Sequence, residues 1–211
     1  MTFVLGPINV RKRSRLPHWD VQHGIHAMTT HLGDALPLDA RLRIRDRMDA
    51  EIAAIRATKG DLTEAERTAI LQRYYRRLNG VLDRGYGACV LRDQRAAQIV
   101  ANSLMFFDGE RYGLFSWSVM PNHFHAVFHC IAPWALDDIV HGWKSYTSHE
   151  TNKCLGREGN LWEEDYWDTT IRNERHFRAA NEYVLNNPAK AGLTNWPFTR
   201  AYPERIAQVL R

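Results

Sequence analysis

Apolar residues fill two neighbouring stretches near the middle of the chain, YGLFSWSVM (112–120) and HFHAVFHC (123–130). In the second stretch, polar and apolar positions alternate, which is typical of a strand with two different faces. A Pro-Asn step separates the two stretches, and such steps favour tight turns. The sequence therefore predicts a β-hairpin here, and the extended stretches at 23–32 and 166–172 are candidates for two further strands.

Apolar residues at helical spacing and end signals predict five helices, at about 39–58, 63–83, 94–107, 135–152 and 174–187. The second begins with a capping box, in which Thr63 and Glu66 each satisfy a free amide of the first turn. Asp93 and Asn173 are suited to cap the third and fifth helices. Pro188 disfavours a helical conformation in the residue before it, so we expect the last helix to end by Asn187.

The order of these elements indicates the fold class. Without residues 39–84, the order is strand, helix, strand, strand, helix, strand, which is the split βαβ, ferredoxin-like pattern of the α+β class. We therefore expect an antiparallel four-stranded sheet with helices on one face. Residues 39–84 form a helical-hairpin insertion after the first strand, and both a lid and a dimer contact stay open as its role. The chain, residues 1–211, is expected to form a single domain.

The composition fits a protein with an apolar core and a polar surface, at 45% hydrophobic and 25% charged residues. No apolar run approaches the ~20 residues of a membrane span. The first residues lack the charge order of a secretory signal. Cys89, Cys130 and Cys154 are odd in number and far apart, which is typical of reduced thiols. We therefore expect a cytoplasmic protein without membrane association.

Positive charge is concentrated in two places, although Lys and Arg outnumber Asp and Glu only by 28 to 24. Within an N-terminal arm, residues 1–16, four basic residues are clustered: Arg11, Lys12, Arg13 and Arg15. A second group lies on one predicted helix: Arg73, Arg76 and Arg77. Basic arms commonly bind phosphate, but a solvated tail accounts for the first cluster equally well. The second is more often a solvated helix face.

His123 and His125 are the first candidates for chemistry. The chain has 10 histidines, so chance alone gives roughly 0.5 His-x-His pairs and the spacing is weak by itself. On a strand, however, residues two apart project from the same face, which places the two imidazoles side by side. The opposite face carries Phe124, Ala126 and Phe128, which suit packing against helices. Two histidines turned to solvent would have no packing role, so a metal site competes with chance on these grounds.

A third ligand could come from the last predicted helix. Tyr183 and Asn187 are four residues apart and share a helix face. They flank the separate apolar stripe of Phe177, Ala180 and Val184 instead of belonging to it. A helical tyrosine is more often a core or rim residue than a nucleophile, so neither half of this set is specific alone.

Together the two segments VMPNHFHAVF and NEYVLNNPAKAGL resemble the signature blocks of the REP-associated tyrosine transposases, a group of single-tyrosine HUH transposases. The resemblance extends to LPHWD, LDRGYGACVLRD, KSYTS and LWEEDYWDTTIRNERHF, in the same order. It covers most of the chain between about residues 16 and 195. Any one block is unspecific, whereas the ordered combination is specific.

The resemblance implies roles for individual residues. His123 and His125 would be metal ligands, Asn187 a third ligand, and Tyr183 the nucleophile that cleaves single-stranded DNA through a 5′-phosphotyrosine. The mixed nitrogen and oxygen ligands suit Mn²⁺ or Mg²⁺, and Zn²⁺ stays open. The expected partner is a single strand folded into a hairpin beside the cleavage site, which would place the protein at the nucleoid. A homodimer stays open.

The basic arm, Lys144 and Arg172 are candidate DNA contacts. Two other functions compete with the transposase. One is a domesticated protein that binds hairpin DNA without cutting it, and the other is a small metallohydrolase that uses the histidine pair and water. The presence of all four site residues disfavours the first, and the second has no need of a tyrosine.

Overall fold

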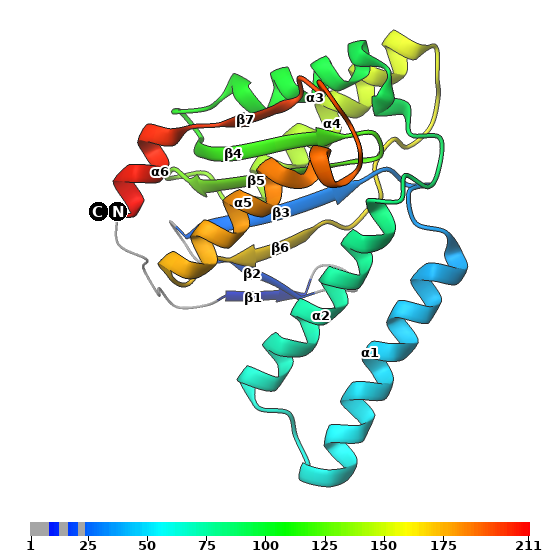
Figure 1. Cartoon of the computed structure of the whole chain (residues 1–211), viewed down its shortest axis with the longest axis vertical. Coiled ribbons are helices and arrows are strands. Elements are labelled where there is room, and N and C mark those ends of the chain that lie inside the picture. Colours follow the sequence, from blue (N-terminus) through cyan, green and yellow to red (C-terminus); the bar gives the residue numbers. More distant parts are fainter. Residues whose placement is uncertain (1–8, 13–16, 21–23) are drawn as a thin grey trace.

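The structure is a computed structural model that describes residues 9–12, 17–20 and 24–211. Its main sheet has five antiparallel strands in the order β6-β3-β5-β4-β7 (Figure 1). The strands are β3 (Ile25–His31), β4 (Tyr112–Met120), β5 (His123–Cys130), β6 (Trp167–Thr170) and β7 (Thr199–Ala201). The first four confirm the predicted strands and their ferredoxin-like order. The fifth, β7, was not predicted and pairs with the outer edge of β4.

Helices cover both faces of the sheet, which corrects the expectation of one covered face. On one face lie α3 (Gln94–Phe106) and α4 (Leu136–Leu155), and on the other α5 (Glu174–Lys190), seen in front of the strands in Figure 1. Each side has its own apolar cluster. The sheet is therefore a middle layer, and anything on its α5 face is enclosed.

The alternation along β5 sorts its side chains between these two clusters. Phe124 and Phe128 pack into the larger cluster with α3 and α4. Val127 packs on the opposite side with Phe177 and Val184 of α5. Because His123 and His125 share the parity of Val127, they point toward α5. The predicted role of the phenylalanine face is thus confirmed, and the histidine face is turned toward α5, the helix that carries Tyr183 and Asn187.

Two long helices, α1 (Leu38–Lys59) and α2 (Glu64–Leu82), form the predicted helical hairpin and project beyond the sheet (Figure 1). The capping box of Thr63 and Glu66 at the start of α2 is present. A short 3-10 helix, η1 (Val90–Arg92), then leads to α3, whose cap is Asp93 as predicted. The base of the hairpin is fixed to the sheet domain, because Tyr74, Leu78 and Leu82 belong to the main apolar cluster.

The N-terminal region forms a small separate sheet of β1 (Asn9–Lys12) and β2 (Pro17–Asp20). The predicted basic arm therefore contains a strand. Its backbone pairs Arg11 with His18 and Lys12 with Pro17. The side chains of Arg11 and Lys12, and all of Arg13 and Arg15, lie outside the described residues.

The predicted end of α5 at Asn187 is wrong, because the helix continues through Pro188 to Lys190. Pro188 lacks an N–H group, so this position makes no bond to the carbonyl four residues earlier. The chain nevertheless keeps its helical course. The N–H of Ala191 donates to the Asn187 carbonyl and that of Leu193 to the Pro188 carbonyl. A proline in the last turn interrupts few bonds, so the turn tolerates it and Asn187 stays within the regular helix.

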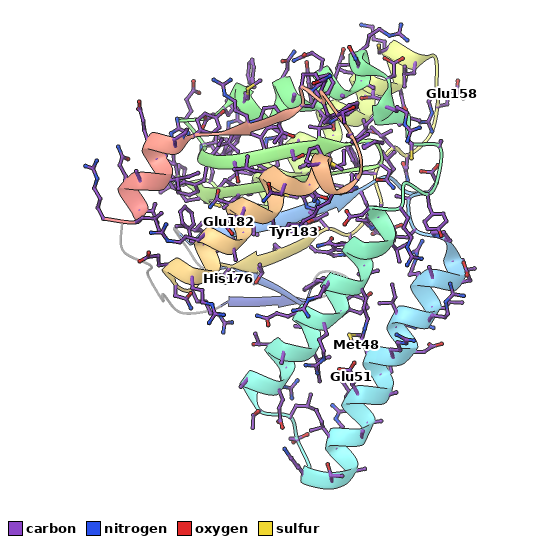
Figure 2. The ribbon with its side chains drawn as sticks, in the orientation of Figure 1. Met48, Glu51, Glu158, His176, Glu182 and Tyr183 are labelled. Carbon is purple, nitrogen blue, oxygen red and sulfur yellow. The ribbon has the colours of Figure 1, made fainter. Side chains whose placement is uncertain are left out.

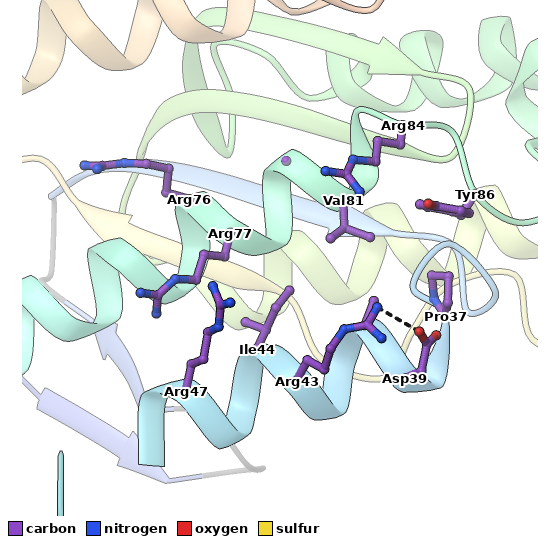
Figure 3. A pocket seen from close by; sticks show the side chains of 12 residues that line it. Pro37, Asp39, Arg43, Ile44, Arg47, Arg76, Arg77, Val81, Arg84 and Tyr86 are labelled. Atoms are coloured by element: carbon purple, nitrogen blue, oxygen red, sulfur yellow. Dashed lines mark ion pairs between the residues drawn. The ribbon is translucent and has the colours of Figure 1, made fainter. Parts of the chain in front are cut away.

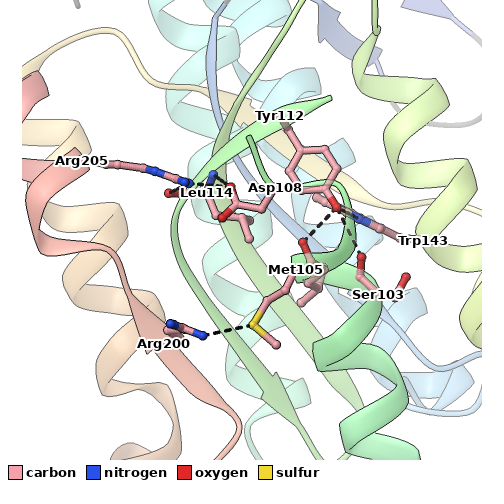
Figure 4. Close-up of polar contacts among 9 residues, drawn as sticks. Ser103, Met105, Asp108, Tyr112, Leu114, Trp143, Arg200 and Arg205 are labelled. Atoms are coloured by element: carbon pink, nitrogen blue, oxygen red, sulfur yellow. Dashed lines mark hydrogen bonds and ion pairs between the residues drawn. The ribbon is translucent and has the colours of Figure 1, made fainter. Parts of the chain in front are cut away.

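The last helix, α6 (Pro203–Val209), was not predicted and is tied to the rim of the sheet by charge. Arg205 pairs with Asp108 and also donates to the Leu114 carbonyl, as Figure 4 shows. Tyr112 also lies on β4, the strand of Leu114, and its hydroxyl accepts a hydrogen bond from Trp143 at 2.9 Å.

In the described part of the chain no helix is long and apolar enough to cross a membrane. None of the three cysteines forms a disulfide.

Candidate active site

His123 and His125 lie side by side beneath α5. Their ring centroids are 4.6 Å apart, with the rings nearly perpendicular. Each histidine is only 1% exposed. The strand geometry predicted from the sequence is therefore present, in a buried setting where each ring nitrogen needs a partner.

The orientation of His123 follows from Asn122. The amide nitrogen of Asn122 donates to the backbone carbonyls of Leu82 and Tyr86, at 3.2 and 3.1 Å. Its oxygen must then be the atom that faces His123 Nδ1, at 2.7 Å. An amide oxygen only accepts, so Nδ1 carries the proton. In the neutral ring, Nε2 holds the lone pair that a metal would require.

His125 is held from the neighbouring strand. Thr29 and His125 are directly opposite each other in the pairing of β3 with β5. The Thr29 hydroxyl lies 2.6 Å from His125 Nδ1. This contact occupies Nδ1 and leaves Nε2 as the second buried imidazole nitrogen without a hydrogen-bond partner among the described residues.

Tyr183 meets this pair from α5, where Figure 2 labels it. Its ring centroid lies 5.2 Å from that of His125, so both groups come together within a single chain. The Tyr183 hydroxyl is buried and makes no hydrogen bond of ordinary geometry with the described residues. The ammonium group of Lys190, about two helical turns after Tyr183 on α5, lies 5.0 Å from the centroid of the Tyr183 ring.

Burial raises the pKa of the Tyr183 hydroxyl above its ordinary value of 10.0, and the nearby Asp83 carboxylate raises it further, while the Asn187 side chain opposes the rise. The hydroxyl is therefore protonated at neutral pH. Any nucleophilic use of Tyr183 requires that this proton be removed or that the local charge be changed.

Asn187 lies one turn after Tyr183 on α5. It is fully buried, and neither polar atom of its side chain has a hydrogen-bond partner within the described residues. Burying an amide without partners costs about 1–3 kcal/mol. An unpaired amide one turn from Tyr183 is thus unfavourable for the fold by itself, and it is explained if a bound group supplies the partner.

Asp83, just after α2, is a site residue that the sequence did not predict. Its Oδ1 lies 3.9 Å from His123 Nε2 and has no hydrogen-bond partner among the described residues. Burial raises the pKa of this carboxyl group, and the charge of Lys190 lowers it. The residue directly follows a helix of the insertion, and no local pattern links that position to the strand bearing His123.

Both imidazoles are neutral at pH 7. Burial lowers the pKa of His125 to about 3. It lowers the pKa of His123 well below its ordinary value too, and the neighbouring histidines add to the effect. Neutral imidazole is the form that binds metal ions, so burial keeps both residues in the ligating state.

The chemistry of these atoms fits a divalent ion. Within the described residues, no three His, Cys, Asp or Glu side chains form a cluster that could hold a metal. The candidate set is instead two imidazole nitrogens and the amide oxygen of Asn187, all buried without partners. Such a mixed set with open positions suits Mn²⁺ and, less well, Mg²⁺.

The predicted DNA contacts at Lys144 and Arg172 lie apart from this cluster. The Lys144 ammonium donates to the carbonyls of Glu163 and Glu164, at 2.7 and 2.6 Å. Two of its three N–H groups are therefore used within the protein. Arg172 is half-buried between β6 and α5, and lines a small pocket with Tyr75.

Comparison with known proteins identifies relatives. Residues 86–187 match the family described as Transposase IS200 like, and this segment contains all four predicted site residues. A REP-associated tyrosine transposase of Escherichia coli (strain K12) is 31% identical over 88 residues, which are 40% of this chain and 51% of the relative. The match thus spans about half the length of that protein. A solved REP-associated tyrosine transposase bound to a REP hairpin is 16% identical with a TM-score of 0.48, covering 92% of this chain and 86% of that one.

Proposed function

We propose that this chain cuts and rejoins single-stranded DNA with Tyr183 as its nucleophile. The premise is that residues 86–187 belong to the IS200-like transposase family. The observation that carries the proposal is the close approach of Tyr183 to His125, at 5.2 Å between ring centroids. A core tyrosine would not need two buried imidazoles with unpaired Nε2 atoms beside it.

The ion would be held by His123, His125 and Asn187. When bound, a divalent ion supplies charge neutralisation at a phosphate oxygen, which lowers the repulsion met by an incoming nucleophile. Asn122 and Thr29 hold the two imidazoles by their Nδ1 atoms, so each Nε2 is aimed without further adjustment.

In the proposed reaction the Tyr183 oxygen attacks phosphorus. A bond forms between that oxygen and the phosphorus, and the bond from phosphorus to the 3′ oxygen breaks. The strand leaves with a free 3′-OH, while the 5′ phosphate stays on the tyrosine. The phenol proton passes to solvent or to a neighbouring base, and the leaving oxygen gains one. Because the phosphoester is conserved, another 3′-OH can reverse the step without a nucleotide cofactor.

The substrate we propose is a strand that carries a hairpin beside the cut. This choice rests on the similarity to the Escherichia coli relative, whose name refers to REP elements. A protein that binds such hairpins without cutting them would need the same DNA surface but no nucleophile. Tyr183 is therefore the residue that separates the two functions.

One assay tests the proposal. The full chain is incubated with a 3′-labelled hairpin-bearing strand and Mn²⁺, and a covalent protein–DNA adduct, which retains the 3′ label, is sought on a denaturing gel. We expect an adduct with the wild type, none with Tyr183→Phe, and an unchanged yield with Tyr146→Phe, whose side chain is 55% exposed and remote from the site. Tight binding without an adduct would identify a non-catalytic hairpin-binding protein. Cleavage that survives Tyr183→Phe would identify a hydrolase.

A further inference from the structure

We infer that the open groove between α1 and α2 binds the sugar-phosphate backbone of a single-stranded DNA. The groove has a volume of about 500 Å³ and lies where the two helices of the insertion diverge near the sheet (Figure 3). Its charged lining residues are Arg43, Arg47, Arg76, Arg77, Arg84 and Asp39. That the bound strand is the substrate's own flank rests on the proposed function, whereas strand binding by the groove does not.

The lining is strongly basic. Five arginines and one aspartate give a net of four positive charges, as many as the formal +4 of the whole chain. Two of the arginines form ion pairs with carboxylates of the protein, Arg43 with Asp39 at 2.7 Å and Arg77 with Glu51 at 2.8 Å. In the described part of the chain, the other three have no carboxylate at ion-pair distance: Arg47, Arg76 and Arg84.

These charges face one another across a helical hairpin. Arg43 and Arg47 are one turn apart on α1, Arg76 and Gly80 are one turn apart on α2, and Arg84 lies two residues beyond the end of α2. Figure 3 shows the side chains of Arg47 and Arg77 reaching toward each other. Like charges on facing helices repel, and a hairpin built only for stability would close this seam with apolar contacts. A polyanion in the groove would convert the repulsion into attraction.

The length of the groove favours a polymer over a single phosphate. Arg76 lies six residues before the end of α2, which is about 9 Å along the helix axis, and Arg84 follows two residues beyond that end. Guanidinium groups spaced in this way can meet successive phosphates, and each presents the planar fork that suits phosphate oxygens. Tyr86 also lines the groove and is 42% exposed, so its ring offers a surface on which an unpaired base can stack.

The groove and the candidate active site meet at the end of α2. Arg84 directly follows Asp83, whose Oδ1 lies 3.9 Å from His123 Nε2. The carbonyl of Tyr86 accepts from Asn122, the residue that orients His123. A strand whose phosphate lies at the histidines would therefore pass the end of α2, which Arg84 follows. Both helices precede the family segment of residues 86–187, so the groove is a feature of the insertion.

The experiment measures binding of a fluorescent 20-nucleotide oligothymidylate to the full chain by anisotropy at several salt concentrations. The test variant is Arg47→Gln/Arg76→Gln, which removes two arginines without breaking an ion pair. The control is Arg45→Gln/Arg56→Gln, which removes the same charge from exposed positions of α1 outside the groove. We expect the test variant to bind at least about fivefold more weakly, with a log–log salt slope smaller by about 1.4. The control should stay within about twofold of the wild type.

Equal weakening in both variants would overturn the inference, because it would reflect net charge alone. Unchanged binding by the test variant, or an equal loss for a duplex of the same length, would overturn it too. The proposed function has its own test: it would be contradicted if the wild type forms no covalent adduct, whatever the result for the groove. If adducts form, the test variant should lower their yield on strands with a ten-nucleotide flank and leave it unchanged on strands without one.

Discussion

Asn122 and His123 are adjacent in the chain and are also joined through their side chains, by a 2.7 Å hydrogen bond from Nδ1 to the amide oxygen. The same amide donates to the carbonyls of Leu82 and Tyr86 behind α2. One buried side chain thus fixes both the tautomer of a candidate ligand and the attachment of the helical insertion. A shift of the end of α2 would therefore move Asn122, and with it the imidazole of His123.

Replacement of Asn122 by alanine should weaken metal binding. His123 would lose the partner that orients it, and second-shell losses of this kind typically lower metal affinity by about 10–100-fold. The freed carbonyls of Leu82 and Tyr86 should also lower the free energy of unfolding by about 1–3 kcal/mol. Calorimetric titration with Mn²⁺ and urea denaturation measure the two effects. Asn102→Ala, at an exposed position, is the control. Wild-type Mn²⁺ affinity in a folded Asn122→Ala protein would contradict this role.

Thr29 offers a cleaner test of His125, because two substitutions separate shape from hydrogen bonding. Thr29→Val keeps the branched shape but removes the hydroxyl that lies 2.6 Å from Nδ1. We expect about a tenfold or greater loss of Mn²⁺ affinity. Thr29→Ser keeps the hydroxyl and should retain most of the affinity. If the two variants lose the same amount, packing and not the hydrogen bond orients the ring.

Asn187→Leu should have opposite effects on stability and on metal binding. It removes two buried polar atoms that lack partners, so the metal-free protein should be as stable as the wild type or more stable, by up to about 1–3 kcal/mol. The same change removes the amide oxygen, so Mn²⁺ should no longer raise the melting temperature. Thermal unfolding with and without Mn²⁺ reads both effects. A Mn²⁺-dependent rise as large as that of the wild type would exclude Asn187 as a ligand.

Tyr183→Phe should leave the fold and the metal site intact. The hydroxyl is buried without a partner, so its removal exposes no unpaired group. We expect a free energy of unfolding equal to or above that of the wild type, and a change in Mn²⁺ affinity of less than about threefold. A clear loss of stability in urea denaturation would show that the tyrosine is a structural residue, and loss of adduct could then not be assigned to chemistry.

The metal-free protein should lose stability in acid through its histidines. The pKa of His125 falls from 6.5 to about 3 on folding, so the unfolded chain binds this proton at a higher pH than the folded one. The stability contributed by this group is complete above about pH 6.5 and declines as the pH falls towards 3. In EDTA, the slope of unfolding free energy against pH should be smaller in His125→Gln than in the wild type.

Local signals predicted most of the fold. The hairpin of β4 and β5, the capping box before α2 and the caps of α3 and α5 all depend on neighbours within a few residues, and all are confirmed. The predicted end of α5 was wrong because a proline in the last turn of a helix interrupts fewer hydrogen bonds than one in the middle. The fifth strand, β7, has only three residues and depends on the free edge of β4.

The candidate site was predictable in part for the same reason. Strand parity placed His123 and His125 on one face, and helical spacing placed Tyr183 and Asn187 on another. Their docking depends on the packing of α5 against the second face of the sheet, which no local pattern indicated, so only the family resemblance linked the two pairs of residues. Asp83 reaches the site because the end of α2 is held by the main apolar cluster and by Asn122, and the contact of Asn122 with Leu82 spans about forty residues of chain.

The location of Tyr183 on α5 also has a consequence for the folding chain. The hairpin of β4 and β5 can bring its two imidazoles together from neighbouring residues, long before residues 174–190 have docked. A partly folded molecule would then present a pair of imidazoles with no tyrosine beside them. Tyr183 therefore lies beside the two imidazoles only in molecules in which α5 has docked on the second face of the sheet.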